Sequence, residues 1–471
     1  MTNESPTDVE QAPLVFDKLL EPVMGFVQGQ QKKLTQHHNE KLDYTTFFRL
    51  LMCFFLIHPD SLKLFITTKL NKGLLPEAFG FSSIPYSTFQ EGFSRFSPNL
   101  FRDIFQHTLK NISFKSVPDF SALGVLCCVD GSLFPVIHSM LWAEYTKDHQ
   151  ALKLHLCFEL NRMIPVDFQL GNGNSSEREA LLKMAAAGVT YIADRGYMSF
   201  QLCRDLVEKH AFFVFRVKEN LLFTVTETLA LSMPESTNRF FDSVSDELIR
   251  YTNDKSKAIY RLVRFTVNQE SYFILTNRQD LTAFQVIMLY AYRWQIELFF
   301  RFLKRTMGGI HLVRHDRAGT TIQFYVMMTL ALLQLHLKQS IMDKTEIKEN
   351  ETCPVKPAES ESCRDKKTTQ NCNSLHAPHE ADNSRLGEVG FLASLGGTVK
   401  KYWKIGVHWL AALRDLLALP FNEKAWHILK AILPHETLGT PVAKYSFTYG
   451  ANWISPSTPC VRFNFAQKPL R

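Results

Sequence analysis

The segment from Tyr290 to Lys304 combines one carboxylate with several polar or cationic side chains on a stretch that is otherwise apolar. At about 100° of rotation per helical residue, an arc of roughly 60° holds Tyr290, Arg293, Glu297 and Lys304. The rest of the circumference is mostly apolar, which is typical of a buried helix. A carboxylate among cations on such a helix suits a metal-and-phosphate site. The same residues also fit a stripe of ion pairs, with Glu297 between Arg293 and Arg301.

Two aspartates can complete a metal site. Asp130 and Asp194 each follow a short apolar stretch that we expect to be a strand, Val125–Val129 and Thr190–Ala193. Reacting groups gather at strand ends in open α/β sheets, and neighbouring strands lie about 4.8 Å apart. Two such carboxylates suit phosphoryl transfer by two Mg²⁺ ions about 3.5–4 Å apart. Each aspartate alone also fits a strand-ending turn, because Asp-Gly and Asp-Arg-Gly are good turn sequences.

The elements around these aspartates predict a mixed α/β sheet. Leu152–Leu160 alternates apolar and polar residues and returns as Ile164–Leu170, which indicates a hairpin. We expect further helices at 176–187, 200–209 and 321–337, and further strands at 212–217, 240–244, 258–267 and 272–275. The last three strands would form an antiparallel insertion within 219–276, ahead of the Tyr290 helix.

Residues 1–115 predict a helical domain. Tyr44–Ile57 has helical spacing, a capping box at Ser87/Gln90 or Thr88/Glu91 would open a second helix, and Ser97-Pro98 would begin a third. Short helices with tight turns fit a DNA-binding domain and also many other bundles. Polar residues 338–388 predict a disordered linker, and residues 389–471 predict a C-terminal helical segment and tail.

Composition sets broad limits. The 471 residues leave room for two or three domains, and a net charge of +7 allows a polyanionic partner without requiring one. Nine cysteines without a CxxC pair favour a reducing compartment. The polar, acidic N-terminus is not a secretory signal, and the apolar runs 50–57 and 324–335 are too short to cross a bilayer. We therefore expect a cytoplasmic protein with no membrane partner.

Five motifs resemble the DDE transposases of bacterial insertion sequences over roughly residues 120–337. They are Asp130-Gly131-Ser132, Ala193–Tyr197, Phe213–Lys218, Phe273–Arg278 and the helix carrying Tyr290, Arg293, Glu297 and Lys304. The last motif has the spacing Y-x2-R-x3-E-x6-K, which marks the insertion-sequence-four-like branch. That spacing is specific, whereas Asp-Gly-Ser alone would be weak.

The resemblance implies an α/β, RNase H-like mixed sheet within 116–337, with a β-rich insertion at 219–276. It implies flanking helices at both ends, those in 1–115 binding the DNA ends. A metal triad of Asp130, Asp194 and Glu297 would hold two Mg²⁺ ions, with Mn²⁺ as a substitute. Tyr290, Arg293 and Lys304 would hold DNA phosphates, which position the duplex.

The implied activity is that of a bacterial, cytoplasmic DNA transposase. It would cleave the ends of an insertion sequence and join the 3′-OH ends to target DNA, as a homodimer on double-stranded DNA. A related metal-dependent nuclease would cut without joining, and a repurposed DNA-binding protein would not cut. Three intact acidic motifs speak against the last alternative.

Other polar residues near the motifs have ordinary structural interpretations. Lys153 and His155 share one strand face and could point toward Asp130, although a core histidine is the more common case. We expect Asp167 to be structural. Glu177 opens a helix and could be mistaken for a metal ligand. Arg216 could reach a phosphate.

Overall fold

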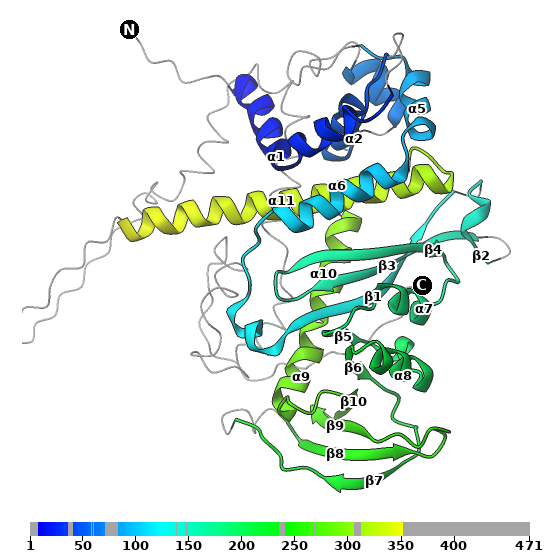
Figure 1. Ribbon diagram of the computed structural model, residues 1–471, viewed down its shortest axis with the longest axis vertical. Helices are drawn as coiled ribbons and strands as arrows, with labels where there is room; N and C mark the ends of the chain where they lie inside the picture. Colours follow the sequence, from blue (N-terminus) through cyan, green and yellow to red (C-terminus); the bar gives the residue numbers. More distant parts are fainter. Residues whose placement is uncertain are drawn as a thin grey trace, which may run out of the picture.

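The computed structural model describes residues 8–35, 41–57, 59, 61–70, 83–137, 139–146, 149–234, 241–267, 269–305 and 312–351. A ten-stranded sheet forms the centre of this part of the chain, with helices packed on both faces and a further group of helices beyond them (Figure 1). The expected mixed α/β class is confirmed.

The sheet has the order β2-β3-β1-β5-β6-β10-β9-β8-β7, and β4 also pairs with β3. Three neighbouring strands are parallel: β1 (Val125–Pro135), β5 (Val189–Ala193) and β6 (Phe212–Arg216). The antiparallel strands are β2 (Glu144–Thr146), β3 (His149–Glu159), β4 (Ile164–Asn172), β7 (Phe223–Thr228), β8 (Ser243–Tyr251), β9 (Tyr260–Val267) and β10 (Glu270–Thr276). The parallel strands therefore lie in the middle of the sheet.

Helices cover both faces of the parallel strands. They are α7 (Glu177–Met184), α8 (Phe200–Glu208), α9 (Ala283–Tyr292), α10 (Trp294–Arg305) and α11 (Arg317–Glu351). Cys127 of β1 packs in a core with α7 and α8, whereas Cys128 packs in the other core, with α9, α10 and α11. This alternation follows from the two-residue period of a strand. Successive side chains of β1 near Asp130 therefore point to opposite faces of the sheet.

The inserted strands continue the sheet. β10 pairs with β6, with Leu275 opposite Phe215, and β9, β8 and β7 follow outward. β9 and β10 lie where the sequence predicts strands. β8 begins at Ser243, later than expected, and β7 was not expected. Because β10 runs antiparallel to β6, its first residues lie near the C-terminal end of β6.

The N-terminal helices are α1 (Asp8–Gln31), α2 (Tyr44–Ile57), α3 (Leu62–Leu64), the π-helix η1 (Phe65–Leu70), α5 (Tyr86–Arg95) and α6 (Pro98–Asn111). The predicted α2 is confirmed, and Ser97 caps α6 by accepting a hydrogen bond from the Asn99 N–H. Neither expected capping box forms at α5. That helix begins earlier, at Tyr86 after Pro85, so Ser87 and Thr88 lie inside its first turn.

These helices share a core with the sheet. In Figure 1, α6 and α11 run side by side between the other N-terminal helices and the sheet. The ring of Phe105 on α6 lies 5.9 Å from that of Phe168 on β4 and 6.1 Å from that of Tyr325 on α11. Core packing therefore bridges the boundary expected between residues 115 and 116.

Helix α11 is longer than expected. It continues to Glu351, so the linker predicted from residue 338 is wrong for 338–351. Lys, Gln, Glu and Met are good helix formers, which allows the helix to continue through this polar stretch. The rest of the linker and the segment 389–471 lie outside the described residues. By length and composition Arg317–Leu337 could cross a membrane, but 78% of its apolar window is buried inside the protein, as in a core helix.

Candidate active site

Asp130 and Asp194 lie at the carboxyl ends of the paired parts of two parallel strands. The pairing of β1 with β5 ends at Cys128 opposite Ile192, two residues before Asp130. The prediction that β1 itself ends at Val129 is wrong, because β3 continues the ladder and holds β1 extended to Pro135. Asp194 follows β5 directly, and its carboxylate accepts a 2.8 Å hydrogen bond from the Arg195 N–H.

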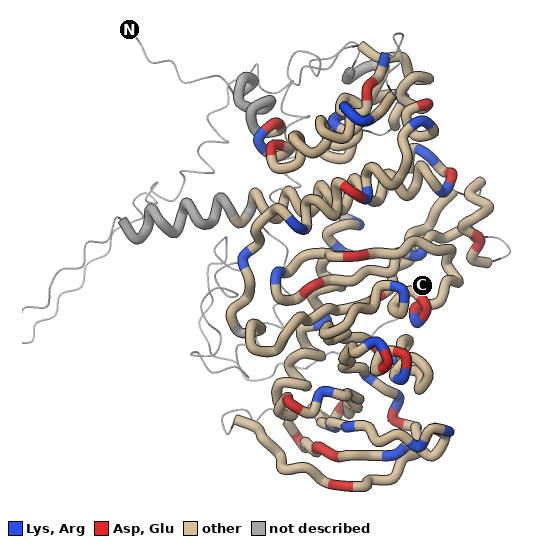
Figure 2. Tube along the Cα trace, in the orientation of Figure 1, with Lys and Arg blue, Asp and Glu red and all other residues tan. Residues whose placement is uncertain are grey.

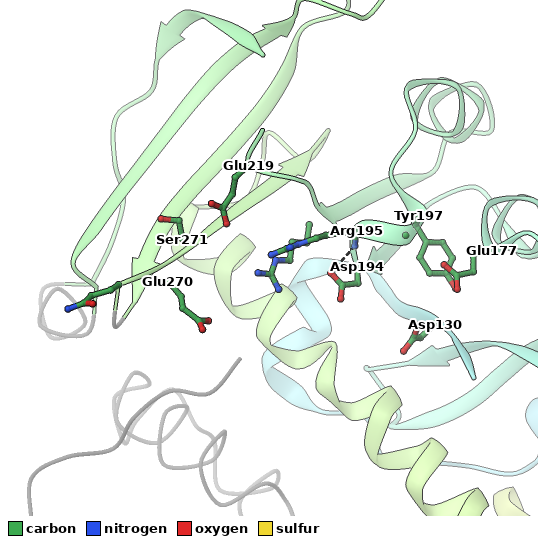
Figure 3. Close-up of a pocket in the computed structure, with 11 residues that line it drawn as sticks. Asp130, Glu177, Asp194, Arg195, Tyr197, Glu219, Glu270 and Ser271 are labelled. Carbon is green, nitrogen blue, oxygen red and sulfur yellow. Dashed lines mark hydrogen bonds between the residues drawn. The ribbon is translucent and has the colours of Figure 1, made fainter. Parts of the chain in front are cut away.

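Both aspartates line one pocket of about 710 Å³. Its walls are Asp130, Glu177, Asp194, Arg195, Gly196, Tyr197, Arg216, Glu219, Gln269, Glu270 and Ser271. In Figure 3, Asp194 lies in the middle, Asp130 and Glu177 lie on one side, and Glu219, Glu270 and Ser271 lie on the other. The pocket thus runs from β1 to the start of β10.

The helix expected over 290–304 is divided in two. α9 ends at Tyr292 and α10 begins at Trp294, with Arg293 between them. The Arg293 N–H bonds to the carbonyl of Tyr290, 3.2 Å away and three residues back, so the backbone tightens at this point. Tyr290 and Glu297 therefore belong to different helices, and the single polar arc assumed from the sequence is not continuous.

Arg293 nevertheless joins the polar residues of both helices. Its guanidinium donates a 2.7 Å hydrogen bond to Glu297 and lies 3.8 Å from the carboxylate of Asp130. The Tyr290 hydroxyl donates to Asp194 over 3.4 Å. The ion pair expected for a helical stripe is present, and the same arginine reaches the strand aspartate. The two interpretations of this segment therefore do not exclude each other.

Lys304 lies farther along α10. Its ammonium nitrogen is 4.9 Å from the centre of the Phe134 ring, near the end of β1. Desolvation lowers the pKa of Lys304, and the charge of Asp130 opposes that shift. The lysine is thus within electrostatic range of the aspartate, although it does not line the pocket.

The negative charge of the Asp130 carboxylate is only partly stabilised by its surroundings. Desolvation raises the pKa of Asp130 to about 6, Arg293 and the Gly131 N–H act in the opposite direction, and Glu297 and Glu177 add to the rise. Neighbouring carboxylates repel one another and favour the protonated form. A bound cation reverses this effect, so the electrostatics of Asp130 suit a cation in the pocket.

The expected triad is not gathered into a metal-binding cluster. Within the described ranges, no three Asp, Glu, His or Cys side chains are grouped closely enough to hold an ion. Asp130 and Asp194 line the pocket, whereas Glu297 is paired with Arg293 and does not. The oxygen donors themselves fit a hard divalent cation. Arg293 supplies the positive charge that pairs with Glu297.

Comparison with known proteins supports the family resemblance. The family model for the transposase DDE domain matches residues 122–333, which contain both aspartates and the divided helix. Residues 122–333 are therefore similar to a transposase DDE domain. The resemblance to transposases of insertion sequences is thereby confirmed.

Three relatives carry transposase names. The chain is 27% identical to the transposase y4zB of Sinorhizobium fredii over 45% of this chain and 60% of that protein. It is 25% identical to a transposase for insertion sequence element IS5377 of Geobacillus stearothermophilus, over 36% of this chain and 44% of that one. It is 21% identical to a transposase for insertion sequence element IS4SA of Synechocystis, over 56% and 73%. The matched region thus spans 60% or less of the length of the first two.

The pocket also contains residues to which the sequence analysis assigned no role in the site. Arg195, Tyr197, Glu219 and Glu270 line the pocket, and Glu177 does so as well. From the sequence, Glu177 was expected to open a helix and to be a residue that could be mistaken for a metal ligand; it begins α7 after the N-cap Ser176. Nothing local shows that this end of the helix approaches β1, because the approach depends on the β3–β4 hairpin between them.

The secondary candidates fall into two groups. Asp167 accepts a hydrogen bond from the N–H of Phe168 and does not line the pocket, so its structural role stays a prediction. Arg216 lines the pocket, and its guanidinium lies 4.5 Å from the centre of the Tyr272 ring. Lys153 and His155 lie beside the pocket, near Glu177.

Proposed function

We propose that this protein is a DNA transposase that cleaves the ends of an insertion sequence and joins the freed 3′-OH ends to target DNA. One observation carries the proposal. In the region that matches a DDE domain, Asp130 and Asp194 line one pocket just beyond the last paired residues of two neighbouring parallel strands, and Arg293 connects Glu297 to Asp130. The same arrangement supports an RNase H-like fold for the core.

We assign the metal ligands to Asp130, Asp194 and Glu297. Two Mg²⁺ ions, or Mn²⁺ in their place, would supply activation of the attacking oxygen and stabilisation of the leaving oxygen. Glu297 must exchange its ion pair with Arg293 to reach the pocket. The released guanidinium is then available to a DNA phosphate, since Arg binds phosphate in bidentate geometry.

The remaining residues of the helix signature position the reactants. Tyr290 orients Asp194 through its hydroxyl, and Lys304 contacts phosphate beyond Asp130. Acidic and basic residues are interspersed along the chain trace rather than segregated (Figure 2). DNA recognition at the pocket therefore rests on these local cations. The helices in 1–115 would bind the element ends.

The proposed reaction also indicates the oligomeric state and the partner of the protein. Two element ends must be brought together with target DNA, so we propose a homodimer on double-stranded DNA in the bacterial cytoplasm. The helix that passes the length test for a membrane is buried in the core and needs no bilayer.

A joining assay tests the proposal. Full-length protein with Mg²⁺ should cleave DNA carrying the element's terminal sequences and should join pre-cut 3′-OH ends to a plasmid. Asp130→Asn and Asp194→Asn should lose both reactions while keeping the circular dichroism spectrum of the parent. Cleavage without joining would identify the nuclease alternative, and retention of both reactions in either variant would refute the assigned site.

A further inference from the structure

Glu177 reaches into a space that two glycines leave open. A Cβ atom built on Gly196 would lie 2.5 Å from Glu177 Oε2, and one built on Gly131 would lie 3.2 Å from Glu177 Oε1. Neither glycine has a positive φ, so the backbone does not require glycine at either position. These glycines belong to the Asp130-Gly131 and Asp194-Arg195-Gly196 motifs. The motifs therefore supply two aspartates and also leave space for a further carboxylate, that of Glu177.

Two more side chains converge on the same place. Lys153 Nζ lies 2.8 Å from Glu177 Oε1, and its Cε would lie 2.9 Å from a Cβ on Gly131. His155 Nδ1 would lie 3.5 Å from that Cβ. His155 is 1% exposed, and Nδ1 has no hydrogen-bond partner in the described chain, whereas Nε2 bonds to Ser175. A buried polar atom without a partner is costly, which favours a polar ligand beside Glu177.

The helix end does not by itself explain Glu177. An acidic residue in the first turn of α7 is favourable, but Glu179 also occupies that turn and is exposed. Glu177 instead lies against the two motif glycines and lines the pocket with Asp130 and Asp194 (Figure 3). Lys153 is the cation that neutralises it in the metal-free protein.

We propose that Glu177 is a fourth carboxylate of the metal pocket, with Lys153 as the counter-ion that a divalent cation displaces. The inference rests on the proposed function, because it assumes that Asp130 and Asp194 bind the cation. It adds a ligand from α7, on the face of the sheet opposite α10. The pocket would then hold its cation from both faces of the sheet.

Mn²⁺ binding to the full-length protein without DNA tests the inference, measured by electron paramagnetic resonance of free Mn²⁺. Glu177→Gln should weaken binding about tenfold, at the lower end of the effects known for residues around a metal. Glu179→Gln removes the same charge from the same helical turn and should leave binding unchanged. Asp130→Asn and Asp194→Asn should abolish it. Thermal unfolding in metal-free buffer checks that each variant is folded.

The outcomes separate the two proposals. If the aspartate variants lose Mn²⁺ and Glu177→Gln binds like the parent, the inference is overturned and the proposed function stands. If the parent protein binds no Mn²⁺, the assignment of Asp130 and Asp194 as metal ligands is refuted, and the inference about Glu177 is refuted with it. Lys153→Met gives an independent check, because loss of a competing cation should tighten Mn²⁺ binding. A purely structural ion pair would instead lower the melting temperature equally in Lys153→Met and Glu177→Gln and leave Mn²⁺ affinity unchanged in both.

Discussion

Arg293 donates a 2.7 Å hydrogen bond to Glu297 from the break between α9 and α10, and the same guanidinium lies 3.8 Å from Asp130. The guanidinium is largely buried, with 9% of the side chain exposed. The guanidinium thus neutralises two carboxylates whose negative charge a metal ion could neutralise instead. Metal binding and the conformation of Arg293 should therefore be coupled.

Removing Arg293 should destabilise the metal-free protein and make it respond more strongly to metal. Arg293→Ala leaves two partly buried carboxylates without their cation, which should lower the free energy of unfolding by about 1–3 kcal/mol. Saturating Mn²⁺ should restore more stability to this variant than to the parent. Urea denaturation with and without Mn²⁺ measures both effects. Arg301→Ala on the same helix is the control, and equal Mn²⁺ stabilisation in all three proteins would contradict the coupling.

Asp130→Asn should stabilise the metal-free protein near neutral pH. The pKa of Asp130 is raised to about 6 in the folded state, above the value of about 3.9 for an unfolded chain. The folded state therefore binds this proton more tightly, and stability falls as pH rises from about 4 to about 6. At pH 7.5 the variant should exceed the parent by about 1–3 kcal/mol, and below pH 4 the difference should vanish. Denaturant titrations across this pH range measure it, and a parent as stable as the variant at pH 7.5 would refute the burial argument.

Gly196→Ala should disturb the pocket without changing any charge. The new methyl group would lie 2.5 Å from Glu177 Oε2, so the carboxylate must move away from its seat. We expect weaker Mn²⁺ binding in the same direction as Glu177→Gln, with an unchanged fold by circular dichroism. Gly29→Ala, at a position with nothing within 4 Å of the added Cβ, is the control. Parent-like Mn²⁺ affinity in Gly196→Ala would show that the position of Glu177 does not matter for the metal.

Tyr290→Phe should affect catalysis more than stability. The hydrogen bond from Tyr290 to Asp194 is long, 3.4 Å, so its loss should cost less than about 1 kcal/mol of unfolding free energy. A residue that orients a metal ligand contributes about 10- to 100-fold in metal affinity or activity. Cleavage of terminal DNA over a Mn²⁺ series should show this loss. Parent activity at every Mn²⁺ concentration would exclude the orienting role.

Lys304→Ala should reduce the salt dependence of DNA binding. Each phosphate contact contributes about 0.9 to the slope of the logarithm of the binding constant against the logarithm of salt concentration. The variant should therefore have a slope lower by about 0.9 than the parent's. Lys209→Ala is the control, since Lys209 bonds to the Leu182 carbonyl on the α7 side of the sheet. Fluorescence anisotropy with labelled end DNA measures the slopes, and identical slopes for Lys304→Ala and the parent would rule out the phosphate contact.

The sequence by itself predicted many of the elements and the resemblance to DDE transposases. The helix Tyr44–Ile57 and the strand leading into Asp194 were predictable because each depends on neighbouring residues and on a local period. The three acidic motifs and the Y-R-E-K spacing were visible for the same reason. Together they predicted a mixed α/β sheet with two aspartates near the carboxyl ends of neighbouring strands. The structure contains both aspartates at the same end of the parallel strands.

Only the tertiary structure decided which side chains meet. The break at Arg293 is a tightening of the backbone within an otherwise helical pattern, and residue spacing alone does not reveal it. Glu177 meets Gly131 and Gly196 because the pairing of β1 with β3 and β5 brings α7 to that edge of the sheet. Glu270 enters the pocket because β10 pairs antiparallel with β6. Such contacts join residues far apart in the chain, and they are set by strand register and packing rather than by any local period.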